Sequence, residues 1–294
     1  MTPLLARWRR SRRKLRNRLA RRFFATRYGR ELLIQCISPK VLSMTADCGD
    51  HVMSFSPHDY IGRKIYRKGQ FERDHVDRLI AVLAGEGLLP SAGTLLEVGA
   101  NIGTQSLYFA LSGHFARVVS IEPDPRNAEL LARNIADNGM TGRIVPVRCA
   151  AGETEGTIDF YQHRDNHGKS SAVAAAVKGS ADKAPNRIPV PVRPVTRILA
   201  DLAIPPEEVD LIWMDIEGYE PVAARSMTPL LARRTPFYLE FSPVFYGPEA
   251  TRLFAGELAR HYDRCILFHE DRLERMRVSD IPLDRPQFDL LLLP

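Results

Sequence analysis

The chain has 294 residues, 45% of them hydrophobic, and it lacks the run of about 18 or more apolar residues that a membrane-spanning helix requires. Its formal net charge is +6, but residues 1–30 hold 12 Arg and Lys residues and no Asp or Glu, so the remainder carries 29 basic and 35 acidic side chains. An acidic body argues against nucleic-acid binding. Four scattered cysteines without a Cys-x-x-Cys pair argue against a zinc or redox site and predict free thiols in the cytoplasm.

Residues 1–30 form a basic segment with apolar residues at near-helical spacing and Arg on the other faces. The pattern predicts a basic amphipathic helix or a disordered tail. Such a helix can lie on an anionic membrane surface or contact an acidic partner, or it can remain solvated. The segment lacks the apolar core of a secretory signal. The apolar residues are Leu4, Trp8, Leu15, Leu19 and Phe23.

The sequence pattern of residues 31–90 predicts an N-terminal elaboration that consists of short strands and a helix. Glu31–Ile37 has strand character, and His51–Phe55 is a candidate hairpin partner. A helix follows over residues 72–83, where apolar residues recur on one face, and glycines end it. The main domain is expected over residues 91–294.

From residue 94 onward, strands and helices alternate, which is typical of a doubly wound α/β fold. Helices are expected over residues 104–111 and 125–138. The pattern predicts a Rossmann-like, mostly parallel, seven-stranded sheet with helices on both faces. The expected strands are Thr94–Val98, Arg117–Ile121, Ile144–Val147, Asp210–Met214, Phe237–Phe241, Cys265–Phe268 and Phe288–Leu293.

The first of these strands leads into a glycine-containing turn that indicates a nucleotide-type cofactor. Glu97 ends the strand, and Gly99 and Gly103 follow four residues apart. Asn101 stands where the second glycine of a dinucleotide fingerprint would lie. The carboxylate of Glu97 would repel a pyrophosphate but suits the cationic amino-acid end of S-adenosylmethionine (SAM). The turn therefore favours SAM over NAD.

Acidic residues follow several predicted strands, at the edge where open α/β sheets bind ligands. Glu122 lies nineteen residues beyond Gly103, where a carboxylate can accept hydrogen bonds from ribose hydroxyls. Asp215, Glu217 and Glu240 follow or end later strands and would form an oxygen cluster suited to Mg²⁺. No histidine pair accompanies them, and we predict no metal.

These motifs together resemble the FkbM family of class I SAM-dependent methyltransferases. The resemblance covers residues 60–242, including Gly69–Glu72, Ala150–Glu153 and Gly168–Ser171. It implies a class I methyltransferase fold and methyl transfer to a hydroxyl oxygen of a small-molecule, carbohydrate or natural-product acceptor.

The resemblance also implies roles for individual residues. Asp215 would lie where the methyl donor meets the acceptor and would act as base or acceptor anchor, with Glu240 and His167 as further catalytic candidates. His167 belongs to a loop that can cover the site, and Ser170 and Ser171 are candidate caps for a helix over residues 172–177. The cofactor residues would be Glu97, Gly99, Asn101 and Gly103 at the methionine end, Glu122 at the ribose, Ala150 and Ala151 at the adenine, and Glu72 closing the pocket beside Asp215.

Two other functions stay open at this point. One is an NAD-linked oxidoreductase, because Glu122 would serve the ribose of either cofactor. The other is a catalytically silent methyltransferase-like domain that acts as a binding module. A nucleic-acid amino-methyltransferase is disfavoured, because its Asn-Pro-Pro-Tyr or Asp-Pro-Pro-Tyr motif is absent.

Overall fold

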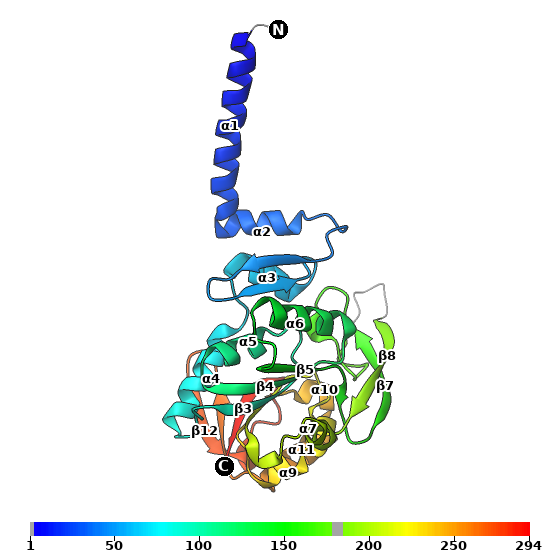
Figure 1. Ribbon diagram of the computed structural model, residues 1–294. Helices are drawn as coiled ribbons and strands as arrows, with labels where there is room; N and C mark the ends of the chain where they lie inside the picture. The colour runs from blue at the N-terminus through cyan, green and yellow to red at the C-terminus, as the bar shows by residue number, and fades with distance from the viewer. Residues whose placement is uncertain (1–2, 178–184) are drawn as a thin grey trace. The chain divides into compact units, whose positions relative to one another are not determined.

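The computed structural model describes residues 3–177 and 185–294 (Figure 1). Contacts divide the chain into two compact units, residues 1–71 and residues 72–294. Helix α4 (Arg73–Gly85), which the sequence assigns to the N-terminal elaboration, packs against α5 (Thr104–Leu111) in the second unit. The three-part division into residues 1–30, 31–90 and 91–294 stays a prediction.

The described part of the first unit consists of helices and a two-stranded antiparallel sheet. The strand predicted over Glu31–Ile37 is wrong, because this segment belongs to a helix. Thr26 caps that helix by accepting a hydrogen bond from the Gly29 N–H at 3.1 Å, which favours helix initiation. The elements are α1 (Pro3–Ala25), α2 (Arg27–Gln35), β1 (Met44–Asp47), β2 (Val52–Phe55) and α3 (Tyr60–Lys68).

Helix α1 carries a row of exposed apolar side chains among its basic residues. Trp8, Leu15, Leu19 and Phe23 are each 47–58% exposed. The side chain of Leu4 lies outside the described part of the chain. None of the helices in residues 3–177 and 185–294 is long and apolar enough to cross a membrane.

The second unit is built on a large sheet whose described strands run in the order β12-β11-β13-β10-β9-β3-β4-β5. The strands from β10 to β5 are parallel, and β13 lies antiparallel between β10 and β11. The predicted Rossmann-like fold is confirmed, with eight strands instead of seven because β12 adds an edge strand. The strands are β3 (Gly93–Val98), β4 (Phe115–Ile121), β5 (Ile144–Val147), β9 (Val209–Met214), β10 (Phe237–Phe241), β11 (Arg264–Phe268), β12 (Leu273–Arg277) and β13 (Phe288–Leu293).

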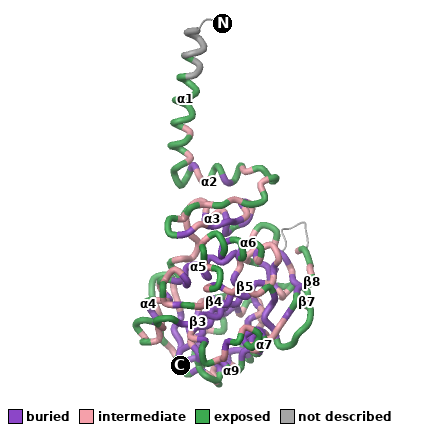
Figure 2. Tube along the Cα trace, viewed as in Figure 1, coloured by how far each residue is buried: buried purple, intermediate pink, exposed green. Residues whose placement is uncertain are grey.

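Helices cover both faces of this sheet, and its central strands are buried between them (Figures 1 and 2). The hydrophobic core on one face joins alternate strand residues, such as Leu96 and Val98, to helices on that side. Glu97 faces the other way, toward α5, because side chains alternate along a strand. The remaining α-helices are α6 (Pro125–Asp137), α7 (Val195–Asp201), α8 (Glu220–Arg225), α9 (Thr228–Ala232), α10 (Pro243–Tyr246) and α11 (Pro248–Ala259).

A small three-stranded sheet, with order β6-β8-β7, accompanies the main one. It consists of β6 (Ala150–Ala151), β7 (Gly156–Gln162) and β8 (Asn186–Arg193). The helix predicted over residues 172–177 is not formed. Ser171 instead makes a local turn, in which its hydroxyl accepts a hydrogen bond from the Val173 N–H at 2.9 Å. Short 3₁₀ turns occur at His167–Lys169, Pro206–Glu208 and Val278–Asp280.

Candidate active site

The turn between β3 and α5 lies directly against the loop after β9. Gly99 has φ of +95°, and a β-carbon at this position would lie 1.9 Å from the carbonyl oxygen of Asp215. The Asp215 N–H donates to the Val98 carbonyl at 3.0 Å. Only glycine permits both the left-handed conformation and this close approach. Gly99 therefore brings Asp215 to the cofactor-type turn.

Gly103 lies at the start of α5, where it packs against α6. Its φ is +87°, and a β-carbon would lie 2.6 Å from Cδ1 of Leu131 on α6. It does not line the cavity described below. The glycine thus lets α5 pack closely on α6. A direct cofactor contact at Gly103 stays a prediction.

Glu122 ends β4 and holds the same turn through its side chain. Its two carboxylate oxygens accept N–H bonds from Asn101 and Asp124, each at 2.8 Å. Burial, followed by the charge of Asp124, raises the pKa of Glu122 to about 8. Each oxygen retains a lone pair, because a carboxylate offers about four acceptor sites. Glu122 can therefore accept additional hydrogen bonds from a sugar.

A cavity of about 520 Å³ opens between this turn, the end of β4 and the small sheet. Its wall is apolar at Ala150, Ala151 and Phe160 and polar at Glu122 and Asp215. Seven of the predicted site residues line it, namely Gly99, Asn101, Glu122, Ala150, Ala151, His167 and Asp215.

Glu97 is set apart from this cavity. Its side chain is fully buried beneath α5, where the Ser106 hydroxyl and the Ser120 hydroxyl donate to Oε2, the latter at 2.9 Å. Oε1 is buried without a hydrogen-bond partner in the described residues. Burial raises the pKa of Glu97 to about 7. Glu97 therefore links β3, β4 and α5 beneath the turn through its hydrogen bonds. Direct contact of Glu97 with a cofactor stays a prediction.

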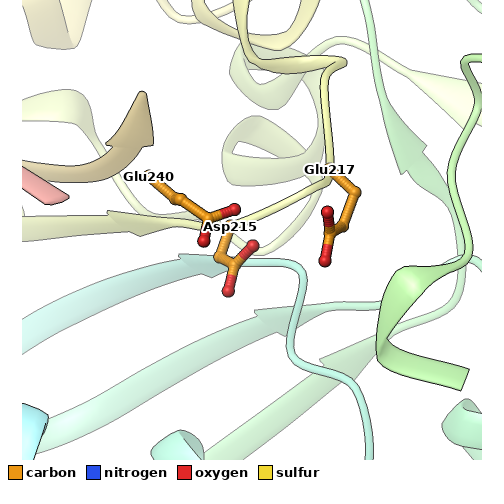
Figure 3. Close-up of side chains that lie close together, drawn as sticks. All are labelled: Asp215, Glu217 and Glu240. Carbon is orange, nitrogen blue, oxygen red and sulfur yellow. The ribbon is translucent and has the colours of Figure 1, made fainter. Parts of the chain in front are cut away.

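Three further acids converge where β9 and β10 end. Asp215, Glu217 and Glu240 each place a carboxylate oxygen within 4.8 Å of the others (Figure 3). Burial, followed by the charge of Asp289, raises the pKa of Asp215 to about 6, and a hydrogen bond from Glu240 lowers it. Burial and neighbouring carboxylates raise the pKa of Glu217 to about 8 and that of Glu240 well above its usual range.

Glu72 interacts electrostatically with Asp215 of this acidic group and does not line the cofactor-type cavity. Its Oε2 accepts a hydrogen bond from Gln105 Nε2 at 2.9 Å. Burial, followed by the charges of Asp215 and Asp289, raises the pKa of Glu72 to about 8. Glu72 also has φ of 58°, an uncommon conformation for a residue with a side chain. Closure of the cofactor pocket by Glu72 stays a prediction.

Glu220 organises the loop after β9 and is a residue that the sequence reasoning missed. Its buried carboxylate accepts N–H bonds from Ile216 at 3.0 Å and Gly218 at 2.9 Å, and an O–H bond from Tyr246 at 2.9 Å. Burial raises the pKa of Glu220 to about 7. In the sequence, Glu220 is visible only as the third acid of the run Asp-Ile-Glu-Gly-Tyr-Glu. The folded loop is needed to show that Glu220 accepts backbone hydrogen bonds, whereas Asp215 lines the cavity.

The loop that carries His167 lies on the cavity, as the sequence predicts. His167, Gly168 and Ser170 contribute to the wall. The Ser171 hydroxyl donates to the carbonyl oxygen of Glu217 at 2.7 Å, which ties this loop to the one after β9. A catalytic role of His167 stays a prediction.

Comparison with known families assigns this architecture. Residues 97–249 match the model of the methyltransferase FkbM domain, which is more than half of the chain. The chain belongs to the FkbM methyltransferase family. The resemblance inferred over residues 60–242 is thus confirmed from Glu97 onward, and the predicted class I methyltransferase fold is confirmed with it.

Two curated relatives of this FkbM-family chain have names that indicate the chemistry. It is 28% identical over 158 residues to 2-O-methyltransferase NoeI of Sinorhizobium fredii, covering 50% of this chain and 63% of the relative. It is 31% identical over 85 residues to methyltransferase sdnD of Sordaria araneosa, covering 29% of this chain and 33% of the relative. The matches span less than two thirds of either relative.

Solved structures similar to the FkbM-family chain include two methyltransferases. One is methyltransferase FkbM from Methylobacillus flagellatus, with 20% identity, a TM-score of 0.45, and coverage of 79% of this chain and 53% of that one. The other is an O-methyltransferase from Bacillus cereus in complex with SAH, the demethylated product of SAM, with 13% identity, a TM-score of 0.39, and coverage of 76% and 90%.

Proposed function

We propose that this FkbM-family chain uses SAM to methylate a hydroxyl oxygen of a small-molecule, carbohydrate or natural-product acceptor. The observation that carries the proposal is the position of Asp215, which lines the cofactor-type cavity and also belongs to the acidic group beside it. A donor in the cavity and a hydroxyl at the acids would meet at this side chain. The name of the relative NoeI, a 2-O-methyltransferase, supports an oxygen acceptor.

The wall of the cavity supports SAM over a dinucleotide. None of its described lining residues is Arg or Lys, so it offers no cation for a pyrophosphate. Ala150, Ala151 and Phe160 supply an apolar surface suited to adenine, and Glu122 supplies acceptors for ribose hydroxyls. Asn101 and Asp215 would face the methionine end. These features match a cofactor that has no phosphate and ends in an amino acid.

SAM supplies an electrophilic methyl group, whose C–S bond breaks as the new C–O bond forms while the sulfur keeps the electron pair. The chain positions the acceptor and removes its proton. Asp215 receives the hydroxyl proton, and Glu240 lies beside it, with carboxylate oxygens of the two residues within 4.8 Å. Positioning contributes roughly 7–11 kcal/mol to such reactions, and a general base contributes about 10²–10⁴-fold. His167 is the second candidate for the base.

A second hollow, lined in part by Asp289, supports an acceptor with several hydroxyls. Its wall combines the aromatic rings of Tyr238 and Phe268 with the polar side chains of His75 and Asp289. Asp289 lies directly opposite Glu240 on the neighbouring antiparallel strand. The carboxylate of Asp289, the imidazole of His75 and the guanidinium of Arg78 can exchange hydrogen bonds with the hydroxyls of a carbohydrate.

Calorimetric titration with SAH, and with NAD as the matched control, tests the cofactor. We expect saturable binding of SAH, with stabilisation of about 2.7 kcal/mol at 100 times the dissociation constant, and no binding of NAD. Incorporation of labelled methyl groups into a panel of sugars and alcohols then tests transfer. Binding of NAD in place of SAH would favour the oxidoreductase. Binding of SAH without transfer across the panel would favour a silent binding module.

We also propose that residues 1–30 contact an anionic membrane surface. Support comes from the twelve basic residues of this segment and the exposed Trp8, Leu15, Leu19 and Phe23 on α1. A helix with this composition binds at the lipid interface through its apolar residues and through attraction to anionic headgroups.

A further inference from the structure

The acidic group at the end of β9 has no ion pair within the described residues, and the one cation that lowers a pKa in it is Lys169, which acts on Glu217. Asp215, Glu217 and Glu240 place carboxylate oxygens within 4.8 Å of one another. In residues 3–177 and 185–294, none of the three forms an ion pair with Arg, Lys or His. Carboxylates this close repel one another strongly when ionised. A cation between them would remove that repulsion.

A second observation concerns one oxygen of Glu240. Its Oε2 is shielded from solvent and accepts no hydrogen bond from the described residues. The carboxylate is directed toward Asp215 (Figure 3). A buried carboxylate oxygen without a partner is costly unless a ligand satisfies it. This oxygen is therefore available to coordinate an ion within the group.

The backbone of the same loop does not supply the missing donors. The N–H groups of Ile216 and Gly218 are both used by the carboxylate of Glu220. The N–H of Asp215 is used by the carbonyl of Val98. The loop is thus folded by its own hydrogen bonds, with the three acids left to face each other.

We propose that Asp215, Glu217 and Glu240 bind one divalent cation of the Mg²⁺ or Mn²⁺ class. Three carboxylates and no nitrogen or sulfur ligand match the preference of hard cations for oxygen. Such ions retain open positions for water or for a substrate oxygen. This inference departs from the prediction made from the sequence, which noted the same three acids but expected no metal.

The role of the ion depends on the proposed methyl transfer. An acceptor hydroxyl bound to the ion would lose its proton more easily, because a Lewis acid stabilises the developing negative charge. One oxygen of Asp215 would ligate the ion, and the other would receive the proton. The hydroxyl oxygen would then form the C–O bond as the C–S bond breaks and the sulfur retains the electron pair.

The site is tested by titrating the full chain with Mn²⁺. Binding is measured in electron paramagnetic resonance as the loss of the signal of free Mn²⁺. We expect saturable binding below about 1 mM that Mg²⁺ displaces. Glu240→Gln and Glu217→Gln should each weaken it by about tenfold or more. Asp289→Asn is the matched control, because it removes a neighbouring charge without removing one of the three carboxylates; we expect a change of less than about threefold. Circular dichroism confirms that each variant is folded.

Two results would overturn the metal site. One is the absence of saturable Mn²⁺ binding by the folded wild-type chain. The other is equal weakening by Asp289→Asn and Glu240→Gln, which would indicate a diffuse negative potential. Titration with SAH in the presence of EDTA separates this inference from the proposed function. If the chain binds SAH but not Mn²⁺, the metal site is ruled out and the methyltransferase proposal stands. If the chain binds Mn²⁺ but not SAH, the methyltransferase proposal is ruled out and the metal site stands.

Discussion

Gly99 and Asp215 are in contact through their backbones, since a β-carbon on the first would lie 1.9 Å from the carbonyl oxygen of the second. This contact joins the cofactor-type turn after β3 to the acidic loop after β9. Gly99 therefore shapes the cofactor-type turn and also determines how closely the acidic loop can approach that turn.

The substitution Gly99→Ala should destabilise the protein and abolish SAH binding. Its left-handed φ costs about 1–2 kcal/mol for any other residue, and the overlap with backbone atoms forces the two loops apart. Gly113→Ala is the matched control, because Gly113 has φ of +82° and open space around a β-carbon. Chemical denaturation measures both. Equal losses of stability in the two variants would contradict the close contact.

Replacing Glu122 by Gln should weaken SAH binding. Above pH 8, where Glu122 is ionised, its carboxylate accepts one N–H bond on each oxygen, whereas an amide has a single acceptor oxygen and would set its NH₂ group against one of these donors. We expect a loss of roughly 10–100-fold, since an unsatisfied buried group costs about 1–3 kcal/mol. Calorimetry measures the affinity, with the exposed Glu129→Gln on α6 as control. An unchanged affinity would exclude Glu122 from the cofactor site.

The variant Asp215→Asn should bind SAH but transfer methyl groups slowly. The amide preserves the shape of the side chain and cannot accept the hydroxyl proton. We expect turnover to fall by about 10²–10⁴-fold, measured once an acceptor is found, with little change in SAH affinity. Turnover at the wild-type rate would transfer the role of base to another residue, with His167→Ala as the next variant to assay.

The pH dependence of stability should reveal the buried Glu97. Its pKa is raised from 4.5 to about 7, so the folded state holds a proton that the unfolded state releases. This contribution is complete below about pH 4.5 and is lost as the pH rises through 7, a change on the order of 3 kcal/mol. Glu97→Gln removes it. Denaturation at pH 5 and pH 8 should therefore show a smaller decline in the variant, and parallel declines would contradict the raised pKa.

Helix α1 should bind vesicles that contain anionic lipid and release them as salt is raised. Each basic residue near such a surface contributes about 1 kcal/mol, and screening removes this attraction. The double variant Leu15→Glu and Leu19→Glu should abolish binding measured by sedimentation. Leu253→Glu, at an equally exposed leucine on α11, is the control. Retained binding by the double variant would show that α1 does not insert its apolar residues.

The sequence by itself determined seven strands of the main sheet, the helices between its first strands, and the composition of the cofactor-type turn. Both signals are local: hydrophobic periodicity defines elements such as Thr104–Leu111, and a glycine at position 99 reports a backbone that no other residue adopts easily. The same local reasoning missed helix α2, where capping by Thr26 overrides the strand-like composition of residues 31–37.

Only the tertiary structure decided what each acid does. Glu97, Glu122, Asp215 and Glu220 look alike along the chain, but strand alternation buries the first under α5 and loop geometry turns the last into a hydrogen-bond acceptor for its own backbone. The meeting of Asp215 with Glu240 depends on the pairing of β9 with β10, which are separated by more than twenty residues of chain. A carboxylate's pKa and partners are set by neighbours in space, so its chemistry emerges only when the sheet is assembled.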